Sequence, residues 1–175
     1  MKKTLLWLDD YRNPFDKKID WMIFSPIGKD IRIEWVKTQQ EFQDYIMING
    51  LPDAICFDHD LGTGNGDGYE CAKWLCEYCD KFEKDLPLYA VQSANVVGKQ
   101  NIISYLENYK RIKNEEKLLK WYRKGFNDEL WDIKSNPPNQ MLKAYELGKN
   151  HAILGDDCRS FDSLTDKEIL ERILM

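Results

Sequence analysis

Long hydrophobic stretches are absent from this sequence of 175 residues. No apolar run exceeds about five residues, whereas a helix needs roughly 20 apolar residues to cross a bilayer. A secretion signal is not recognised either, because Met1-Lys2-Lys3 leads into the acidic pair Asp9-Asp10 within the length of one strand. The sequence therefore predicts a protein without a membrane span, located in the cytoplasm.

The sequence also has few cysteines and histidines, and it has no excess of basic over acidic residues. The five cysteines are an odd number, so we expect no disulfide framework and a reducing compartment. Lys and Arg total 25 against 30 Asp and Glu, and neither sign forms a long block, which excludes a broad basic face for nucleic acid. Of the two histidines, His59 and His151, the second is predicted to lie in a loop, as is the pair Asp156-Asp157, rather than to bind a metal.

Apolar content, by contrast, is sufficient for a folded core. Hydrophobic residues make up 43% of the chain and charged residues 31%. A chain of this length is expected to hold one main core and a smaller appendage. We place the α/β domain at residues 1–111 and a helical C-terminal extension at residues 112–175.

Three short apolar runs resemble strands that are buried on both faces, and each ends at polar residues. Leu5–Leu8 precedes Asp9-Asp10, Ala54–Phe57 precedes Asp58-His59-Asp60, and Leu88–Val91 precedes Gln92-Ser93-Ala94-Asn95. The segment 31–36 alternates apolar and charged residues, which predicts an edge strand. Helical patterns at 39–49, 68–81 and 98–110 alternate with these strands, whereas residues 12–29 are predicted to form a loop or a short distorted helix.

Strands that alternate with helices require a parallel sheet with right-handed crossovers. We predict a flavodoxin-like three-layer fold with four strands in the order 2-1-3-4. In the extension, the pattern predicts a helix at 115–131, a second at about 139–148, and a last one that begins at the capping box Thr165 to Glu168. This extension is expected to pack on the core, to bind a protein partner or to mediate self-association.

The carboxyl ends of parallel strands meet at one edge of a sheet, where ligands bind in such folds. Asp9, Asp10 and Asp58 should therefore lie together, and their mutual repulsion calls for a cation. Carboxylate oxygens suit Mg²⁺ or Mn²⁺. The alternative is that these residues only cap turns, with Asp10 capping the loop toward Arg12 and Asp60 capping a turn.

His59 and the residues after the fourth strand are candidates for proton transfer and phosphate binding. His59 can exchange a proton near neutral pH with help from Asp60, unless it is a structural histidine turned away from Asp58. Ser93 and Asn95 can bind a phosphate, together with Arg12, Lys99 and the helix start at Gly98. The alternatives here are an ordinary turn with an Asn cap and a solvated lysine.

These motifs resemble a known family. The strings Leu8-Asp9-Asp10, Asp58, Asp67-Gly68 and Ser93-Ala94 are similar to response-regulator receiver domains, in which the acidic pair and the third-strand aspartate hold magnesium. The fuller strings, from Leu8 to Pro14, Phe57 to Gly62 and Ser93 to Gly98, resemble the divergent receiver-like branch that processes cyclic phosphates, found in phages and bacteria. The resemblance covers about residues 4–110.

Two departures from the pattern bear on function. The fifth strand, which ends in a phosphate-contacting lysine in ordinary receivers, is not recognised here. Gln92 stands where the divergent branch often has histidine. The leading hypothesis is a metal-dependent phosphoesterase for a cyclic nucleotide or a 2′,3′-cyclic phosphate at an RNA end. The alternatives are a catalytically silent receiver that binds a nucleotide or a protein, and a domain that accepts phosphate on Asp58.

Overall fold

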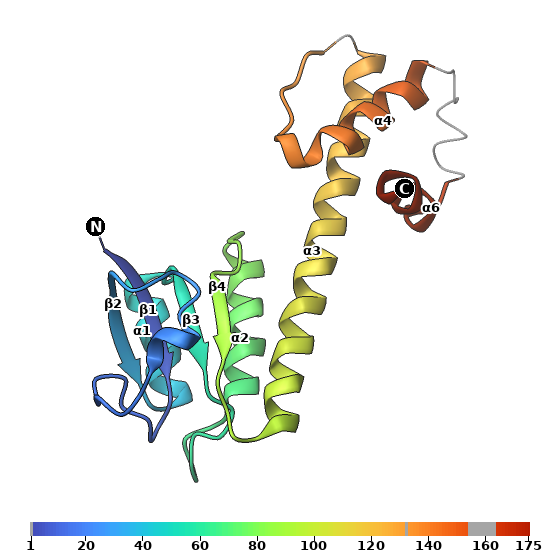
Figure 1. Cartoon of the computed structure of the whole chain (residues 1–175). Coiled ribbons are helices and arrows are strands. Elements are labelled where there is room, and N and C mark those ends of the chain that lie inside the picture. The colour runs from blue at the N-terminus through green and yellow to red at the C-terminus, as the bar shows by residue number, and fades with distance from the viewer. Residues whose placement is uncertain (1, 132, 154–163) are drawn as a thin grey trace. The chain divides into compact units, whose positions relative to one another are not determined.

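A computed structural model describes residues 2–131, 133–153 and 164–175 of the chain. The described residues form two units, Met1–Tyr109 and Lys110–Met175. The first holds the sheet with its helices and the second is helical (Figure 1). The predicted domain boundary, between residues 111 and 112, falls inside a helix that contributes to both units.

The first unit is built on a parallel sheet of four strands. These are β1 (Lys3–Leu8), β2 (Ile31–Val36), β3 (Ala54–Phe57) and β4 (Leu88–Val91), in the order β2-β1-β3-β4. Pairing is parallel throughout, with Leu8 opposite both Val36 and Phe57. The predicted strand order is therefore confirmed, and among the described residues the sheet has no fifth strand.

Alternating residues of the central strands face two different layers. Leu6, Leu8, Ile55 and Phe57 pack against side chains of α1 (Gln39–Asn49), α2 (Gly68–Lys81) and the first part of α3 (Val96–Leu130). Leu5, Trp7, Ala54 and Cys56 lie on the opposite face under the loop of residues 12–29, which contains the 3-10 helix η1 (Trp21–Phe24). The irregular segment thus serves as the third layer (Figure 1).

Helix α3 (Val96–Leu130) differs from the prediction of separate helices at 98–110 and 115–131. The apolar pattern stops between these two segments, but the charged residues there pair along the helix. Arg111 contacts Glu115 at 2.6 Å and Lys113 contacts Glu116 at 2.6 Å. Such pairs stabilise an exposed helix, and residues 99–124 contain no Pro or Gly, so the chain continues as one helix through this segment.

The second unit consists of the rest of α3, the 3-10 helix η2 (Asn139–Met141), α4 (Leu142–Ile153) and α6 (Asp166–Leu174). Its main hydrophobic cluster consists of the buried residues Leu118, Leu119, Tyr122, Met141, Ala144, Ile169 and Ile173. The capping box of Thr165 and Glu168 is confirmed. His151 was predicted in a loop but lies in α4, where Nδ1 is 2.6 Å from the Tyr122 hydroxyl. The pair Asp156-Asp157 lies outside the described residues.

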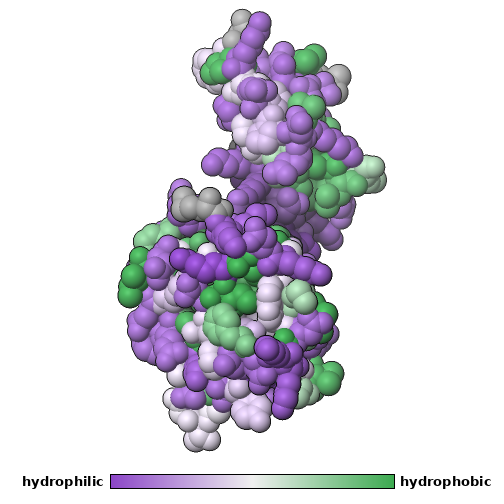
Figure 2. Space-filling view, turned by 60° about the vertical axis from the view of Figure 1, so that its left-hand side comes forward, coloured by the Kyte–Doolittle hydropathy of each residue, from purple (hydrophilic) through white to green (hydrophobic). Residues whose placement is uncertain are grey.

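Polar and charged side chains cover much of the surface seen in Figure 2. The residues of β1 and β3 next to the site are fully buried, as expected for central strands of a parallel sheet. Among the described residues, no helix combines the length and the apolar character that a membrane span requires.

Candidate functional site

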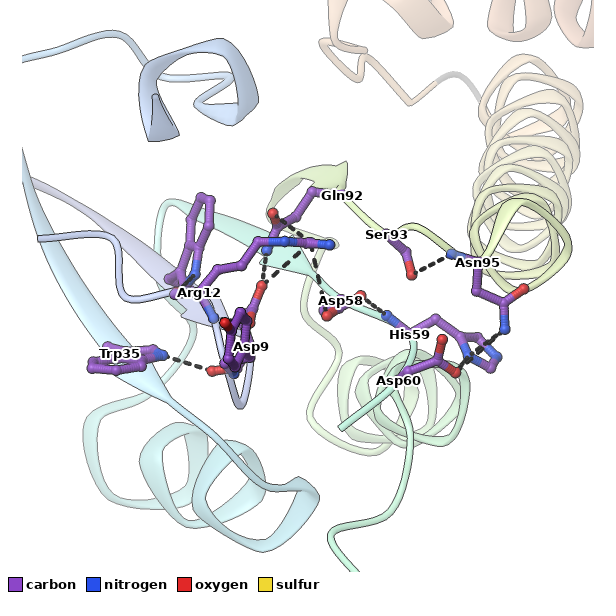
Figure 3. A network of polar contacts seen from close by, with 11 residues as sticks. Asp9, Arg12, Trp35, Asp58, His59, Asp60, Gln92, Ser93 and Asn95 are labelled. Atoms are coloured by element: carbon purple, nitrogen blue, oxygen red, sulfur yellow. Dashed lines mark hydrogen bonds and ion pairs between the residues drawn. The ribbon is translucent and has the colours of Figure 1, made fainter. Parts of the chain in front are cut away.

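Polar side chains gather where β1, β3 and β4 end, at one edge of the sheet (Figure 3). Asp9 and Asp10 follow β1, and Asp58 follows β3. One carboxylate oxygen of each lies within 4.8 Å of one from each of the others. Strand pairing fixes this arrangement, because the Asp58 N–H donates to the Leu8 carbonyl at 2.9 Å. The structure thus brings together the three residues that the sequence predicted as metal ligands.

Asp9 is completely buried and is bonded on both carboxylate oxygens. Its Oδ1 accepts the backbone N–H groups of Tyr11 at 2.9 Å and Arg12 at 2.5 Å. Its Oδ2 accepts a hydrogen bond from Nε2 of Gln92 and lies 3.5 Å from the Arg12 guanidinium. These bonds fold the loop after β1 around the Asp9 side chain.

The Arg12 side chain lies among the carboxylates. Besides its contact with Asp9, Nη1 is 3.9 Å from Oδ2 of Asp58 and donates to Oε1 of Gln92 at 3.0 Å. Because the Gln92 amide accepts from Arg12 and donates to Asp9, it links the two side chains (Figure 3). Arg12, predicted to bind phosphate, is thus also the counter-ion of the acidic cluster in this structure.

Asp58 is almost fully buried, with 6% of its surface exposed. Burial raises the pKa of its carboxyl group, and the nearby Asp9 charge adds to this, whereas a hydrogen bond with Ser93 and the charge of Arg12 act in the opposite direction. Its Oδ1 accepts the backbone N–H of His59 at 2.8 Å. A cation bound beside this carboxyl group would favour its ionised form.

The His59 side chain turns away from the acidic cluster, toward Asp60 and Asn95 (Figure 3). Asp60 Oδ1 lies 2.8 Å from His59 Nδ1 and 3.3 Å from Asn95 Nδ2. The hydrogen bond with His59, and to a smaller extent the one with Asn95, lowers the pKa of Asp60 and favours its carboxylate form. Asp60 thus orients the imidazole, and Nε2 has no hydrogen bond among the described residues.

The residues after β4 connect the two groups of the site, which are the acidic cluster of Asp9, Asp10 and Asp58 and the pair of His59 and Asp60. Ser93 interacts with Asp58 and accepts the backbone N–H of Asn95 at 3.2 Å. Asn95 caps helix α3, because its Oδ1 accepts the Gly98 N–H at 2.9 Å. That Gly98 N–H is therefore already used within the protein, and Gly98 itself lies directly against the His59 ring.

Lys99 lies in the first turn of α3 and is partly exposed. Its backbone N–H donates to the Asn95 carbonyl at 2.9 Å. No hydrogen bond or ion pair of its ammonium group is seen among the residues that the structure describes. Its predicted contact with phosphate stays a prediction.

A hard divalent cation fits the donor set of Asp9, Asp10 and Asp58, because carboxylate oxygens are the ligands that Mg²⁺ and Mn²⁺ prefer. Asp10 is the most exposed of the three, since it is partly exposed whereas Asp9 and Asp58 are buried. Two of the three ligands also contact Arg12, so the cation and the guanidinium would share them.

Three residues of the site were missed by sequence reasoning. Gln92 was considered only as a replacement for histidine, yet it bonds both Arg12 and Asp9. Two tryptophans hold the loop after β1, since Trp35 Nε1 donates to the Asp9 carbonyl at 2.6 Å and Trp7 Nε1 to the Arg12 carbonyl at 2.9 Å. A buried indole N–H needs an acceptor, but the sequence does not say which one.

The parallel sheet and the acidic edge define a receiver-like domain. Residues 4–108 match the model of the cyclic-phosphate processing receiver domain. The match covers more than half of the chain, and this chain therefore belongs to that family. No curated protein matches it.

One similar solved structure is a fusion protein that contains amino acids 181–211 of the yeast Spc42 trimeric coiled coil joined to another structure. The sequence identity is 23% and the TM-score is 0.41. The similarity covers 59% of this chain and 62% of the solved chain.

Proposed function

We propose that this protein is a metal-dependent phosphoesterase that hydrolyses a small cyclic phosphate, either a cyclic nucleotide or a 2′,3′-cyclic phosphate at an RNA end. The observation that carries the proposal is the cluster of Asp9, Asp10 and Asp58, whose carboxylate oxygens approach within 4.8 Å. Membership of the cyclic-phosphate processing family supports the choice of substrate class.

The reaction adds one water molecule to the phosphodiester. The water oxygen bonds to phosphorus, one ring P–O bond breaks, and the released alkoxide takes up the proton that the water loses. A cation bound to Asp9, Asp10 and Asp58 would supply Lewis-acid stabilisation of the phosphoryl charge. His59 is the proposed carrier of the proton, because Asp60 orients Nδ1 and leaves Nε2 available.

Phosphate binding is assigned to side chains around this centre. The hydroxyl of Ser93 lies beside Asp58, and the amide of Asn95 lies beside the His59 ring, with Nδ2 3.5 Å from Nδ1 (Figure 3). Arg12 and Lys99 can add positive charge at either side, and charge-assisted hydrogen bonds to a phosphate are stronger than neutral ones. A substrate held here would contact both groups of the site at once.

Phosphorus NMR tests the proposal directly. The full chain is incubated with Mg²⁺ or Mn²⁺ and a panel of 2′,3′- and 3′,5′-cyclic nucleotides and short RNAs with cyclic phosphate ends. We expect loss of one cyclic signal and growth of a monoester signal. Asp58→Asn should slow this by at least about 100-fold, whereas Asp44→Asn on α1, which changes the same charge on an exposed helix, should not.

An unchanged spectrum across the panel would refute the enzyme and favour a silent receiver that binds its ligand without turnover. One observation supports that second function: Arg12 and Gln92 already bond the buried Asp9 side chain. Saturable binding of a nucleotide without product would then be the expected result. Phosphate on Asp58 after treatment with acetyl phosphate would instead indicate a phospho-acceptor domain.

A further inference from the structure

We propose that Arg12 is an internal counter-ion that competes with the divalent cation for Asp9 and Asp58. In the metal-free protein its guanidinium neutralises these carboxylates, and metal binding requires it to move away from them. The inference rests on the metal site of the proposed function, but it concerns a residue outside the ligand set. It predicts that removal of Arg12 strengthens metal binding.

The first argument is that the Asp9 carboxylate has no unused direction. Its two oxygens offer about four acceptor positions. Backbone N–H groups of Tyr11 and Arg12 take two, the Gln92 amide takes a third, and the Arg12 guanidinium faces the remaining one at 3.5 Å. A cation can reach Asp9 only by replacing one of these donors. The side-chain donors are the exchangeable ones, because the backbone donors belong to the turn itself.

The second argument is electrostatic. Three carboxylates and one guanidinium leave a formal charge of −2 at the cluster, and without Arg12 the charge would be −3. Asp9 is fully buried and Asp58 nearly so, so solvent screens these charges poorly. A divalent cation bound to the same oxygens would be repelled by a guanidinium within about 4 Å of them.

The third argument is that only the end of Arg12 needs to move. Its backbone carbonyl is held by Trp7 and its N–H by Asp9, so the main chain is fixed. The side chain is 31% exposed, which gives the guanidinium a path toward solvent. Gln92 opposes this motion, because its Oε1 accepts a hydrogen bond from Arg12 Nη1 at 3.0 Å. A guanidinium displaced in this way can then bind the phosphate.

Mn²⁺ binding provides a test that does not depend on turnover. Free Mn²⁺ is measured by electron paramagnetic resonance during titration of the full chain. We expect Arg12→Ala to bind Mn²⁺ at least tenfold more tightly than the wild type. Arg32→Ala is the matched control: Arg32 is exposed on β2, its guanidinium lies 3.1 Å from Glu34, and its loss changes the net charge equally. Its affinity should stay within twofold of the wild type.

Gln92→Ala is the second variant and guards against misfolding of Arg12→Ala. This variant removes the hydrogen bond that holds the Arg12 guanidinium but leaves the charge of the site unchanged. Mn²⁺ affinity should therefore rise, but less than in Arg12→Ala. Equal or weaker Mn²⁺ binding in both variants would overturn the inference, and if phosphorus NMR still shows metal-dependent turnover, the proposed function stands without it. Absence of Mn²⁺ binding in every variant would instead refute the metal site and the proposed function together with the inference.

Discussion

Substitution of Gly98 by alanine tests the contact that positions His59. A Cβ at residue 98 would lie 2.7 Å from His59 Nδ1 and closer still to two ring carbons. Ordinary contacts of this kind are about 3.5 Å or longer, so the ring must move by about 1 Å. The imidazole can turn outward, because its side chain is already 20% exposed. In doing so it leaves Asp60, whose Oδ1 lies 2.8 Å from Nδ1.

Two opposing effects on stability follow from this displacement. Alanine in place of glycine near the start of α3 stabilises the helix by up to about 1 kcal/mol. Loss of the hydrogen bond between His59 and Asp60 costs about 1 kcal/mol. Gly98→Ala should therefore change the free energy of unfolding little in the wild type. On a His59→Ala background no ring is displaced, and the same change should stabilise by up to about 1 kcal/mol, or roughly 2–4 °C in melting temperature.

The measurement is a double-mutant cycle of the four proteins, followed by denaturant unfolding. A coupling of about 1 kcal/mol between residues 59 and 98 is expected. Additive effects, with a coupling below about 0.4 kcal/mol, would refute the close packing of His59 on Gly98. If the proposed function is correct, turnover gives a second measure, since displacement of His59, the proposed proton carrier, should lower kcat by about 100-fold in Gly98→Ala.

Three further substitutions probe the charge and the packing of the chain around the site. Asp58→Asn should raise the melting temperature of the metal-free protein at neutral pH, because a carboxyl with a raised pKa destabilises the fold once it is ionised. The gain in melting temperature should vanish as the pH falls below the usual carboxyl range, where Asp58 is protonated in the folded and unfolded states alike. A gain that persists at this low pH would contradict a raised pKa of Asp58 as its cause. Gly68→Ala places a Cβ 3.1 Å from the Cα of His59 and against the Asp58 carbonyl group, so it should lower the free energy of unfolding by about 2–4 kcal/mol in urea. Gly64→Ala, where a Cβ has open space but φ is +82°, should cost only about 1–2 kcal/mol, and equal losses at the two positions would contradict this account.

The sheet could be predicted because buried parallel strands leave a simple pattern. Each run from Leu5–Leu8 to Leu88–Val91 is continuously apolar and stops at the polar edge, so its end marks the site. Helix α3 could not be predicted as one element. Its middle lacks apolar periodicity, and the pairing of Arg111 with Glu115 depends on the helix already being formed.

Within the site, proximity could be predicted but bonding could not. The ends of β1 and β3 bring Asp9 near Asp58 in any sheet of this order. The role of Gln92 depends on the register of β4, where its N–H donates to the Phe57 carbonyl at 2.8 Å, and on a loop that brings Arg12 to it. Neither the register nor the loop conformation leaves a signal in the sequence.

The neighbours Asp58 and His59 explain why the site has two groups. Successive residues at the end of a strand point to opposite sides, so one side chain enters the acidic cluster and the other reaches Asn95. Ser93 interacts with Asp58 and bonds the Asn95 N–H, which ties the groups together. Under the proposed function, a phosphate that contacts Ser93 could meet a cation bound to the acidic cluster on one side and the imidazole on the other. Substitutions at Asp58 should then act on metal affinity, and substitutions at His59 on the pH dependence of turnover with metal affinity retained.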